Sequence, residues 1–513
     1  MITLQDLNPN VLRAEYAVRG PVVERAQKLE AEGRKIIYCN IGNPQALKQR
    51  PLTYLRQLLA LLEYPALMDD AAAAAHFPPD VVARARGILA KHPHGTGAYS
   101  QSCGIPFIRQ AVADFIARRD GIETKQEHVI LTDGASGGVK LTIVSLLKHP
   151  HDGILIPTPQ YPLYSAEIAL RGGRRINYYL DEAHDWQLSE AALTDAIVHA
   201  RRDGANPVAI TVINPGNPTG AVLSYENIAM VIGFAQRHGV AIMADEVYQE
   251  NVYAAGRTFH SFAKVMHDLG VRDVSLFSFH SISKGFLGEC GHRGGYVEIR
   301  NIPGDVLAEL AKLQSIALCS NLPGQMATYV MVAPPQPGDA SHERYVAERD
   351  GVLAQLKTKA ELLARGINAI EGMTLAMPQG AMYGFVRFAL PPEPDVDVSA
   401  MTPEARRDYE GKRDSDYCLA LLEEAGICVV PGSGFGQRPG TFHFRTTFLP
   451  PMDEIEALVA RLKTFHERYV ASLASRSPAA APVEVGAGPR TQRRLRLVLE
   501  HGLLISTVYR PAW

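Results

Sequence analysis

The segment Ser281-Ile282-Ser283-Lys284-Gly285-Phe286, followed by Gly288-Glu289-Cys290-Gly291-His292-Arg293-Gly294-Gly295, decides the fold of this chain. It places one lysine between two serine hydroxyls and an arginine, directly after the apolar run at residues 274–279. Such a run predicts a buried strand, so Lys284 lies at the end of a strand and not on the face of a helix. Schiff-base chemistry needs a neutral amine, and burial beside another cation favours that form. The segment therefore predicts a lysine that holds an aldehyde cofactor carrying a phosphate.

A second buried strand is predicted upstream, where Val240-Ala241-Ile242-Met243-Ala244 leads into Asp245-Glu246-Val247-Tyr248. This order puts an acid and a phenol at the carboxyl end of a strand, where α/β proteins bind ligands. A carboxylate beside a pyridine nitrogen keeps that nitrogen protonated, which makes the ring a better electron sink. An isolated aspartate at this place is otherwise a helix N-cap. In this setting Asp245 is the predicted partner of a cofactor ring.

A phosphate monoester carries about −1.5 to −2 charges at neutral pH, so one arginine does not neutralise it. Further donors are available in Thr132-Asp133-Gly134-Ala135-Ser136-Gly137-Gly138, a glycine-rich turn between a predicted strand and an apolar helix. Backbone N–H groups and the positive end of a helix dipole favour an anion there. Such a turn also occurs where tight packing alone requires it. Together with Ser281, Ser283 and Arg293 it predicts a phosphate site.

Two further segments supply groups for a substrate. Asn214-Pro215-Gly216-Asn217-Pro218-Thr219-Gly220 follows a predicted buried strand and is either a rigid turn or the carrier of Asn217 as a ligand. Thr441-Phe442-His443-Phe444-Arg445 alternates in polarity, which places Arg445 on the same strand face as His443. A guanidinium grips a carboxylate through two parallel hydrogen bonds, which a lysine does not. Arg445 is therefore the predicted site for a substrate carboxylate.

These segments, in this order, resemble the fold type I aminotransferases that use pyridoxal phosphate. The Gly-Glu-Cys-Gly spacing after Lys284 is most similar to the alanine aminotransferase branch, and the resemblance covers about residues 10–470. Arg293 lies one residue farther from Lys284 than in many relatives, a spacing that the alanine branch shares. The resemblance implies an α/β fold with a large domain, whose mostly parallel sheet of the seven-stranded type lies between helices. It also implies a smaller α+β domain built from both chain ends.

The resemblance implies a role for each candidate residue. Lys284 is the expected Schiff-base lysine and the later carrier of the substrate's α-proton, with Asp245 and Tyr248 as the other catalytic residues. The cofactor-binding residues are expected to be Ala135, Ser136, Tyr161, Asn217, Asp245, Tyr248, Ser281, Lys284, Arg293 and Tyr99. The substrate-binding residues are expected to be Gly42, Asn217 and Arg445. No metal site is expected.

Several of these expectations are specific about geometry. Tyr161 is expected to stack on the cofactor ring, while Asn217 and Tyr248 bond to the ring oxygen. Gly42, in Asn40-Ile41-Gly42-Asn43-Pro44-Gln45, is expected to offer its backbone N–H from a segment that closes over the substrate. Tyr16 and Arg19 are weaker candidates for that closure. Tyr99 is expected to reach the phosphate of a neighbouring subunit, which implies a homodimer with shared active sites.

The length of 513 residues predicts a large domain and at least one smaller one. Apolar runs at residues 129–131, 154–156, 208–213, 240–244, 274–279 and 296–299 alternate with longer amphipathic stretches, which predicts a parallel sheet covered by helices. The predicted division is an N-terminal arm with part of the small domain (1–95), a large cofactor-binding domain (96–335) and a C-terminal small domain (336–474). The Ser-, Pro- and Ala-rich composition after residue 475 predicts a disordered tail over 475–513.

Bulk properties exclude several classes of function. A formal net charge of −2 offers no electrostatic reason to expect nucleic acid as a partner. The six cysteines form no Cys-x-x-Cys pair, which argues against a disulfide framework or a thiolate zinc site and fits a reducing compartment. The amino terminus has no signal-peptide pattern and the apolar runs are too interrupted to cross a bilayer. A cytoplasmic protein that binds no membrane is expected.

The resemblance implies a ping-pong aminotransferase that exchanges an amino group between an L-amino acid and a 2-oxo acid through the cofactor. L-alanine and 2-oxoglutarate are the expected pair. One alternative is a lyase or cyclase of the same fold, similar to the ACC synthases or the carbon–sulfur lyases. It differs in regenerating the aldehyde cofactor and releasing a fragment of the substrate. A remote alternative is a regulatory protein that binds the cofactor without catalysis.

Overall fold

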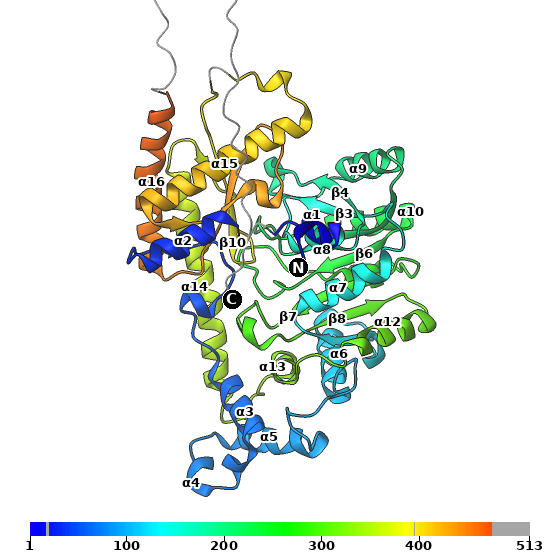
Figure 1. Ribbon diagram of the computed structural model, residues 1–513. Coiled ribbons are helices and arrows are strands. Elements are labelled where there is room, and N and C mark those ends of the chain that lie inside the picture. The colour runs from blue at the N-terminus through cyan, green and yellow to red at the C-terminus, as the bar shows by residue number, and fades with distance from the viewer. Residues whose placement is uncertain (17–19, 394–395, 475–513) are drawn as a thin grey trace, which may run out of the picture.

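The computed structural model describes residues 1–16, 20–393 and 396–474. Two predictions lie outside the described residues: the contribution of Arg19 to substrate closure, and the disordered tail at 475–513. The rest of the chain forms two packed parts, a larger one around one broad sheet and a smaller one around a short sheet (Figure 1).

A seven-stranded sheet forms the centre of the larger part, in the order β2-β8-β7-β6-β5-β3-β4. Its strands are β2 (Val129–Thr132), β3 (Asp152–Thr158), β4 (Arg174–Tyr179), β5 (Asn206–Ile213), β6 (Ala241–Asp245), β7 (Leu276–Ser281) and β8 (Gly295–Arg300). Strand β8 runs antiparallel to β2 and β7, while the other neighbouring pairs are parallel. The inner strands are buried on both faces, as their continuous apolar runs require. The prediction of a mostly parallel sheet is confirmed.

Helices cover both faces of this sheet (Figure 1). Apolar side chains of α7 (Ala135–Leu146), α8 (Leu163–Leu170) and α12 (Gly304–Ile316) form a core cluster with one face. On the other face lie α9 (Glu190–Arg202), α10 (Tyr225–His238) and α11 (Phe262–Asp268). Local signals mark these helices: the Ser224 hydroxyl accepts from the backbone N–H of Asn227 at the start of α10, and Gly239 ends it with a φ of 67°.

A third group of helices adjoins β2 and β8. Its members are α3 (Thr53–Glu63), α5 (Pro79–Lys91), α6 (Pro106–Asp120) and α13 (Leu322–Val332), which share one apolar cluster. Shorter helices are α1 (Pro9–Arg13) and α4 (Ala71–Ala74), and 3₁₀ turns are η1 (Leu4–Asp6), η3 (Gln45–Leu47), η4 (Pro65–Met68), η5 (Gln126–His128), η6 (Glu182–His184), η7 (Cys290–His292), η8 (Val398–Ala400) and η9 (Gly432–Phe435).

The domain boundaries drawn from the sequence stay a prediction.

The smaller part contains an antiparallel sheet in the order β12-β13-β10-β9. Its strands are β9 (Met373–Thr374), β10 (Tyr383–Phe388), β12 (Val430–Pro431) and β13 (Phe442–Thr447), and it packs with α2 (Pro21–Ala31), α14 (His342–Asn368), α15 (Pro403–Ala425) and α16 (Met452–Ala474). A parallel pair, β1 (Ile37–Tyr38) with β11 (Ile427–Cys428), joins the N-terminal segment to the C-terminal one. The predicted α+β domain built from both chain ends is confirmed.

The two parts are tied together by the carboxylate of Glu182, which follows β4. It lies 3.1 Å from Nε2 of His443 on β13 and accepts a hydrogen bond of 3.4 Å from Nη1 of Arg387 on β10. His443 is 2% exposed and stacks on Phe385 with ring centroids 4.6 Å apart. The contact therefore couples the edge of the large sheet to the strand that carries Arg445.

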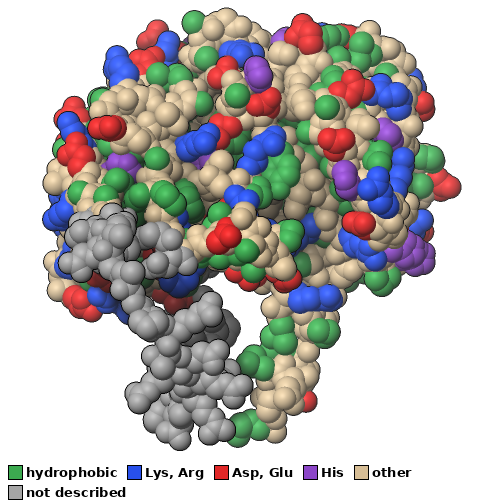
Figure 2. All heavy atoms as spheres, turned by 90° about the horizontal axis from the view of Figure 1, so that it is seen from above, with side chains coloured by type: hydrophobic (Ala, Val, Ile, Leu, Met, Phe, Trp, Pro, Cys, Tyr) green, Lys and Arg blue, Asp and Glu red, His purple; other side chains and the backbone are tan. Residues whose placement is uncertain are grey.

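Figure 2 shows basic and acidic side chains interspersed over one face of the molecule. Among the described helices, none is both long and apolar enough to cross a membrane.

Candidate active site

The loops that carry the predicted site residues meet at the carboxyl ends of the parallel strands of the large sheet. In the parallel register Ile213 of β5 pairs with Asp245 of β6, and Asp245 pairs with Phe279 of β7. Three neighbouring strands therefore end side by side. They lead into the turn with Asn217, into Asp245 and into the loop with Lys284. Open α/β sheets bind their ligands at this end of the strands.

Asp245 is a buried carboxylate with one unpaired oxygen. Its side chain is 5% exposed, and Oδ2 accepts a hydrogen bond of 2.8 Å from the Tyr164 hydroxyl. Oδ1 has no hydrogen-bond partner among the described residues. Burial raises the pKa of Asp245 to about 6, although the Tyr164 hydroxyl, the backbone N–H of Val247 and the charge of Lys284 act in the opposite direction. A buried oxygen of this kind fits a donor such as a protonated ring nitrogen.

Helix α7 begins directly after Gly134, whose φ of 70° and ψ of 175° suit glycine alone. Ala135 and Ser136 are therefore the first two helical residues, so their backbone N–H groups belong to the first turn. A Cβ built on Gly134 lies 2.6 Å from Nη2 of Arg293, so a larger residue would displace that arginine. The helix terminus and the arginine thus form one cradle suited to an anion.

Arg293 links this terminus to the loop after β7. Its Nη2 donates to the Ser136 hydroxyl at 3.1 Å, and its Nη1 lies 3.5 Å from the Ser283 hydroxyl. The Ser281 hydroxyl in turn donates to Ser283 at 3.0 Å. The structure thus brings together all four side chains that the sequence assigned to a phosphate. Three hydroxyls and a guanidinium match the donor set that such a group needs.

Lys284 is half-buried, and its amine donates to the backbone carbonyl of Gly42. In this structure Gly42 therefore turns its carbonyl oxygen toward the amine, whereas the sequence led us to expect a role for its N–H. Glu289 fixes the loop that carries Lys284. Its side chain is 2% exposed and accepts a hydrogen bond of 2.9 Å from Nη2 of Arg56 on α3. Glu289 belongs to the Gly-Glu-Cys-Gly segment, so its ion pair with Arg56 holds that loop against α3.

Arg445 is 1% exposed and held on several sides. Its Nη1 donates to Oδ1 of Asn217 at 3.3 Å, and its Nη2 donates to the carbonyl of Asn40. The guanidinium carbon lies 4.4 Å from the ring centroid of Tyr383 and 4.7 Å from that of Phe435. Nε has no hydrogen-bond partner among the described residues. A buried cation with a free donor fits a carboxylate ligand.

Four tyrosine hydroxyls surround this region. The Tyr248 hydroxyl donates to that of Tyr383 at 3.4 Å, and the hydroxyls of Tyr16 and Tyr161 lie 2.6 Å apart. The structure thus places Tyr16 beside a predicted cofactor residue. Tyr99 is different, because it is 76% exposed and forms none of these contacts.

Two residues of the site were not identified from the sequence. Tyr164 contacts Asp245, and Tyr383 contacts Arg445. Both tyrosines stand in apolar stretches, where a tyrosine is normally interpreted as part of the hydrophobic core. The position of Tyr164 three residues after Tyr161 is the one local signal in the sequence.

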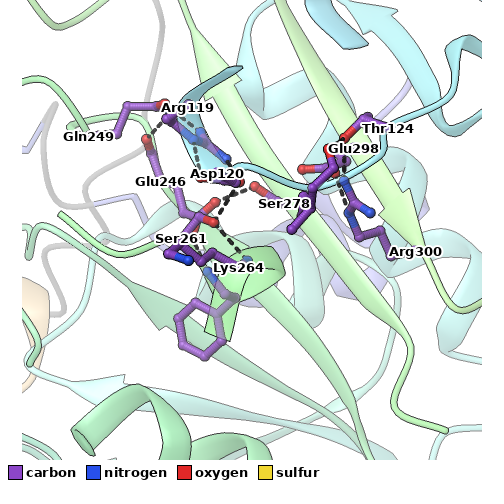
Figure 3. A network of polar contacts seen from close by, with 12 residues as sticks. Arg119, Asp120, Thr124, Glu246, Gln249, Ser261, Lys264, Ser278, Glu298 and Arg300 are labelled. Carbon is purple, nitrogen blue, oxygen red and sulfur yellow. Dashed lines mark hydrogen bonds and ion pairs between the residues drawn. The ribbon is translucent and has the colours of Figure 1, made fainter. Parts of the chain in front are cut away.

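Behind Asp245, the next residue joins a buried polar network (Figure 3). Glu246 accepts hydrogen bonds from the Ser278 hydroxyl and, at 2.8 Å, from the backbone N–H of Phe262. Burial raises the pKa of Glu246 to about 7, against the opposing effect of Arg119. Arg119 itself forms a two-fold hydrogen bond with Asp120, at 2.7 and 2.5 Å. This network anchors the end of β6 to α6, β7 and α11, and so fixes the place of Asp245.

Comparison with known proteins identifies the family. A model of the aminotransferases of class I and II matches residues 69–462. Alanine aminotransferase 1, mitochondrial, of Arabidopsis thaliana is 46% identical over 481 residues, which cover 91% of this chain and 87% of that protein. Glutamate–glyoxylate aminotransferase 1 of the same plant is 44% identical over 467 residues, with 90% and 95% covered. The solved alanine aminotransferase of Pyrococcus furiosus superposes with a TM-score of 0.71 at 25% identity, covering 90% of this chain and all of that one.

The resemblance inferred from the sequence is thereby confirmed. Enzymes of this family use pyridoxal phosphate, and the unpaired oxygen of Asp245, the anion cradle at α7 and the amine of Lys284 fit that cofactor. When bound, the cofactor supplies an electron sink for the reaction at the substrate's α-carbon. The lyase or cyclase alternative is not favoured, since the relatives are aminotransferases. The chain belongs to the aminotransferases of class I and II and is a pyridoxal phosphate-dependent aminotransferase that acts on amino acids and 2-oxo acids.

Proposed function

We propose that this aminotransferase moves the amino group of L-alanine to 2-oxoglutarate in a ping-pong exchange. The observation that carries the proposal is that Tyr383 has the Lys284 amine near its hydroxyl, beside Gly42, and the Arg445 guanidinium against its ring, which suits an α-amino acid held by its carboxylate. The choice of alanine is supported by relatives at 46% identity that are named alanine aminotransferases. Glyoxylate is a second candidate acceptor, because a relative at 44% identity is named for it.

The proposed cofactor contacts follow from the contacts between side chains. Asp245 holds the ring nitrogen through its free oxygen, and Tyr164 keeps the other oxygen in place. Tyr161 stacks on the ring, while Asn217 and Tyr248 bond to the ring oxygen. The phosphate occupies the cradle formed by Ala135, Ser136, Ser281 and Arg293.

The proposed substrate contacts centre on Arg445, which binds the α-carboxylate together with Asn217 and Gly42. Gly42 must turn its N–H toward the substrate, so its segment moves when the substrate enters. Lys284 then carries the α-proton between the α-carbon and the cofactor, as a base of suitable reach at the strand end.

The first experiment is an absorbance spectrum of the cofactor-loaded protein before and after L-alanine, and again after 2-oxoglutarate. We expect conversion of the cofactor to its amine form with alanine and its return with the acceptor. Release of ammonia or an alkene without any product from the acceptor would overturn the proposal. Lys284→Ala is the matched control, and glyoxylate in place of 2-oxoglutarate compares the two acceptors.

We also propose a homodimer with shared active sites, in which Tyr99 reaches the phosphate of the neighbouring subunit. Its 76% exposure in the single chain supports this role. Mixing Tyr99→Phe chains with Lys284→Ala chains tests it. A mixed dimer has one site that carries both lesions and one that carries neither, so activity above that of either parent is expected. Sedimentation as a monomer would exclude the dimer.

A cytoplasmic location is the last part of the proposal. All six cysteines are free, which suits a reducing compartment. Two relatives are named as mitochondrial, so cell fractionation with activity assays in each fraction decides the location.

A further inference from the structure

Tyr383 occupies the space between the two ends of the proposed site. It is the first residue of β10 and is 2% exposed. A Cβ built on Gly42 lies 1.7 Å from the Tyr383 hydroxyl oxygen and 3.0 Å from Nζ of Lys284. The hydroxyl and the amine therefore border the same side of Gly42. The Tyr383 ring also lies against the guanidinium of Arg445. A substrate that reaches both the amine and the guanidinium must lie along this tyrosine.

The ring of Tyr383 is one half of an aromatic clamp. The guanidinium carbon of Arg445 lies 4.4 Å from its centroid and 4.7 Å from the centroid of Phe435. Two rings packed against a planar guanidinium restrict its rotation, and the unpaired Nε stays available to a carboxylate. The clamp therefore favours one orientation of Arg445 before a substrate arrives, which lowers the entropy lost on binding.

The hydroxyl of Tyr383 lies in a positive environment. Burial alone would raise the pKa of Tyr383, but the charges of Lys284 and Arg445 and the hydrogen bond donated by Tyr248 outweigh burial and lower that pKa below its ordinary value of 10. Cys290, at η7, acts weakly in the opposite direction. The groups that face the phenol from the neighbouring elements thus favour its ionised form.

We propose that Tyr383 is a further residue of the active site with two separable functions: its ring positions Arg445, and its hydroxyl exchanges a proton with the amine of Lys284. In the exchange the phenolate takes one proton from the Lys284 ammonium, which leaves a neutral phenol and a neutral amine; the reverse transfer restores both charges. The proton stays within the pair, so no other reactant is needed. The neutral amine is the form that acts as a base. This inference rests on the proposed roles of Lys284 and Arg445.

Four variants separate the two functions. Tyr383→Phe removes the hydroxyl and keeps the ring, whereas Phe435→Leu removes the other ring and keeps the hydroxyl. Tyr383→Leu removes both. Tyr417→Phe is the matched control, since it loses a buried hydroxyl that lies 3.0 Å from Nδ1 of His466, away from the site.

The ring function is tested by the dissociation constant of propionate, an unreactive carboxylate with the carbon skeleton of alanine, on the cofactor-loaded enzyme. We expect binding to weaken about 5- to 20-fold in Phe435→Leu and Tyr383→Leu, within the range of cation–π contacts. Tyr383→Phe and Tyr417→Phe should stay within about twofold of the unaltered enzyme. Unchanged binding in Phe435→Leu would overturn the ring function, even if Tyr383→Leu does not fold.

The hydroxyl function is tested by ultraviolet titration of tyrosinate in enzyme loaded with pyridoxamine phosphate, where the amine of Lys284 is free. The unaltered enzyme should show one tyrosine that ionises at lower pH than the rest, and Tyr383→Phe should lack it. Phe435→Leu and Tyr417→Phe should retain it. In turnover, Tyr383→Phe should lower kcat about 10-fold or more, with KM within about twofold. Identical titrations in Tyr383→Phe and the unaltered enzyme would overturn the proton exchange.

Neither the propionate nor the tyrosinate measurement requires turnover. If the unaltered enzyme does not convert L-alanine, the proposed substrate pair fails while both measurements still decide the functions of Tyr383. If alanine is converted and both measurements are unchanged by the variants, the substrate pair holds and the inference about Tyr383 fails.

Discussion

Asp245 and Arg445 share a physical property: each has a buried polar atom that lacks a partner among the described residues. Oδ1 of Asp245 and Nε of Arg445 are the two that face the proposed cofactor and substrate. Each unpaired buried group costs about 1–3 kcal/mol. The protein thus stores at single residues part of the free energy that ligand binding releases.

Asp245 makes the stability of the cofactor-free protein depend on pH. Its pKa rises from the ordinary value of 3.8 to about 6 on folding, so the folded state binds a proton that the unfolded state releases. The stabilisation is complete below the unfolded value and is lost as pH rises through the folded one, by about 3 kcal/mol. Asp245→Asn should abolish this dependence. Urea unfolding of both proteins between about pH 4 and pH 7 measures it, and parallel curves would contradict the prediction.

Arg445 is expected to act on substrate binding and not on cofactor binding. Arg445→Lys keeps the charge but loses the two-fold grip and the planar fit between Tyr383 and Phe435. We expect KM for the amino acid to rise about 10-fold or more, which corresponds to about 1.4 kcal/mol or more, with the cofactor affinity unchanged. Steady-state kinetics and cofactor titration measure the two effects. An unaltered KM would refute the carboxylate role.

The sequence predicted the parts of the site that depend on chemistry and missed those that depend on packing. Lys284, Arg293 and Ser281 are predicted as site residues because they stand in one short segment after a predicted buried strand, and the structure connects Ser281 and Arg293 through Ser283. Tyr164 and Tyr383 could not be predicted, because a buried tyrosine acquires its role from what the fold places beside its hydroxyl. Such neighbours lie on other elements, 81 residues away in the case of Tyr164 and Asp245, and composition does not reveal them.

Among the elements, the buried strands were the most predictable. Six of the seven strands of the large sheet contain an apolar run that stands out in the sequence. The exception is β4, one of the two edge strands, in which exposed residues, Arg174 and Arg175 among them, alternate with buried ones, so its pattern lacks a continuous apolar run. A strand is easy to recognise in the sequence when both of its faces are buried, because it then forms a continuous apolar run. In β4 one face and one edge are exposed to solvent.

The start of α7 yields a prediction about glycine. Gly134→Ala should impose backbone strain of about 1–3 kcal/mol and push its Cβ against Arg293, so both stability and cofactor affinity fall. Gly121→Ala is the matched control, because Gly121 has the same φ of 70° at the end of α6 with nothing within 4 Å of an added Cβ. It should lower stability and leave cofactor affinity unchanged. Thermal unfolding and cofactor titration measure the two, and equal cofactor affinity in both variants would contradict the cradle.

Over the whole molecule, the contact of Glu182 with His443 and Arg387 is expected to set the position of the smaller part. Glu182→Gln keeps the size of the side chain and removes its charge, so we expect a loss of about 1–2 kcal/mol in stability and a several-fold rise in KM, since β13 carries Arg445. Glu424→Gln, at an exposed pair with Arg468, is the control and should change stability by less than about 1 kcal/mol. Hydrogen exchange of β13 that is equal in the two variants would refute the coupling.

The pairing of β1 with β11 also sets an order of events during synthesis. Ile37 cannot meet Ile427 until the ribosome has added the residues between them. At about 5–20 residues per second, the interval is about 20–80 seconds. Until the C-terminal helices are made, the apolar face of α2, with Val22, Ala26 and Leu29, has no partner from them, whereas all strands of the large sheet are synthesised before the interval ends. The nascent protein therefore presents an early apolar helix to chaperones, and its smaller part folds last although its first helix is made first.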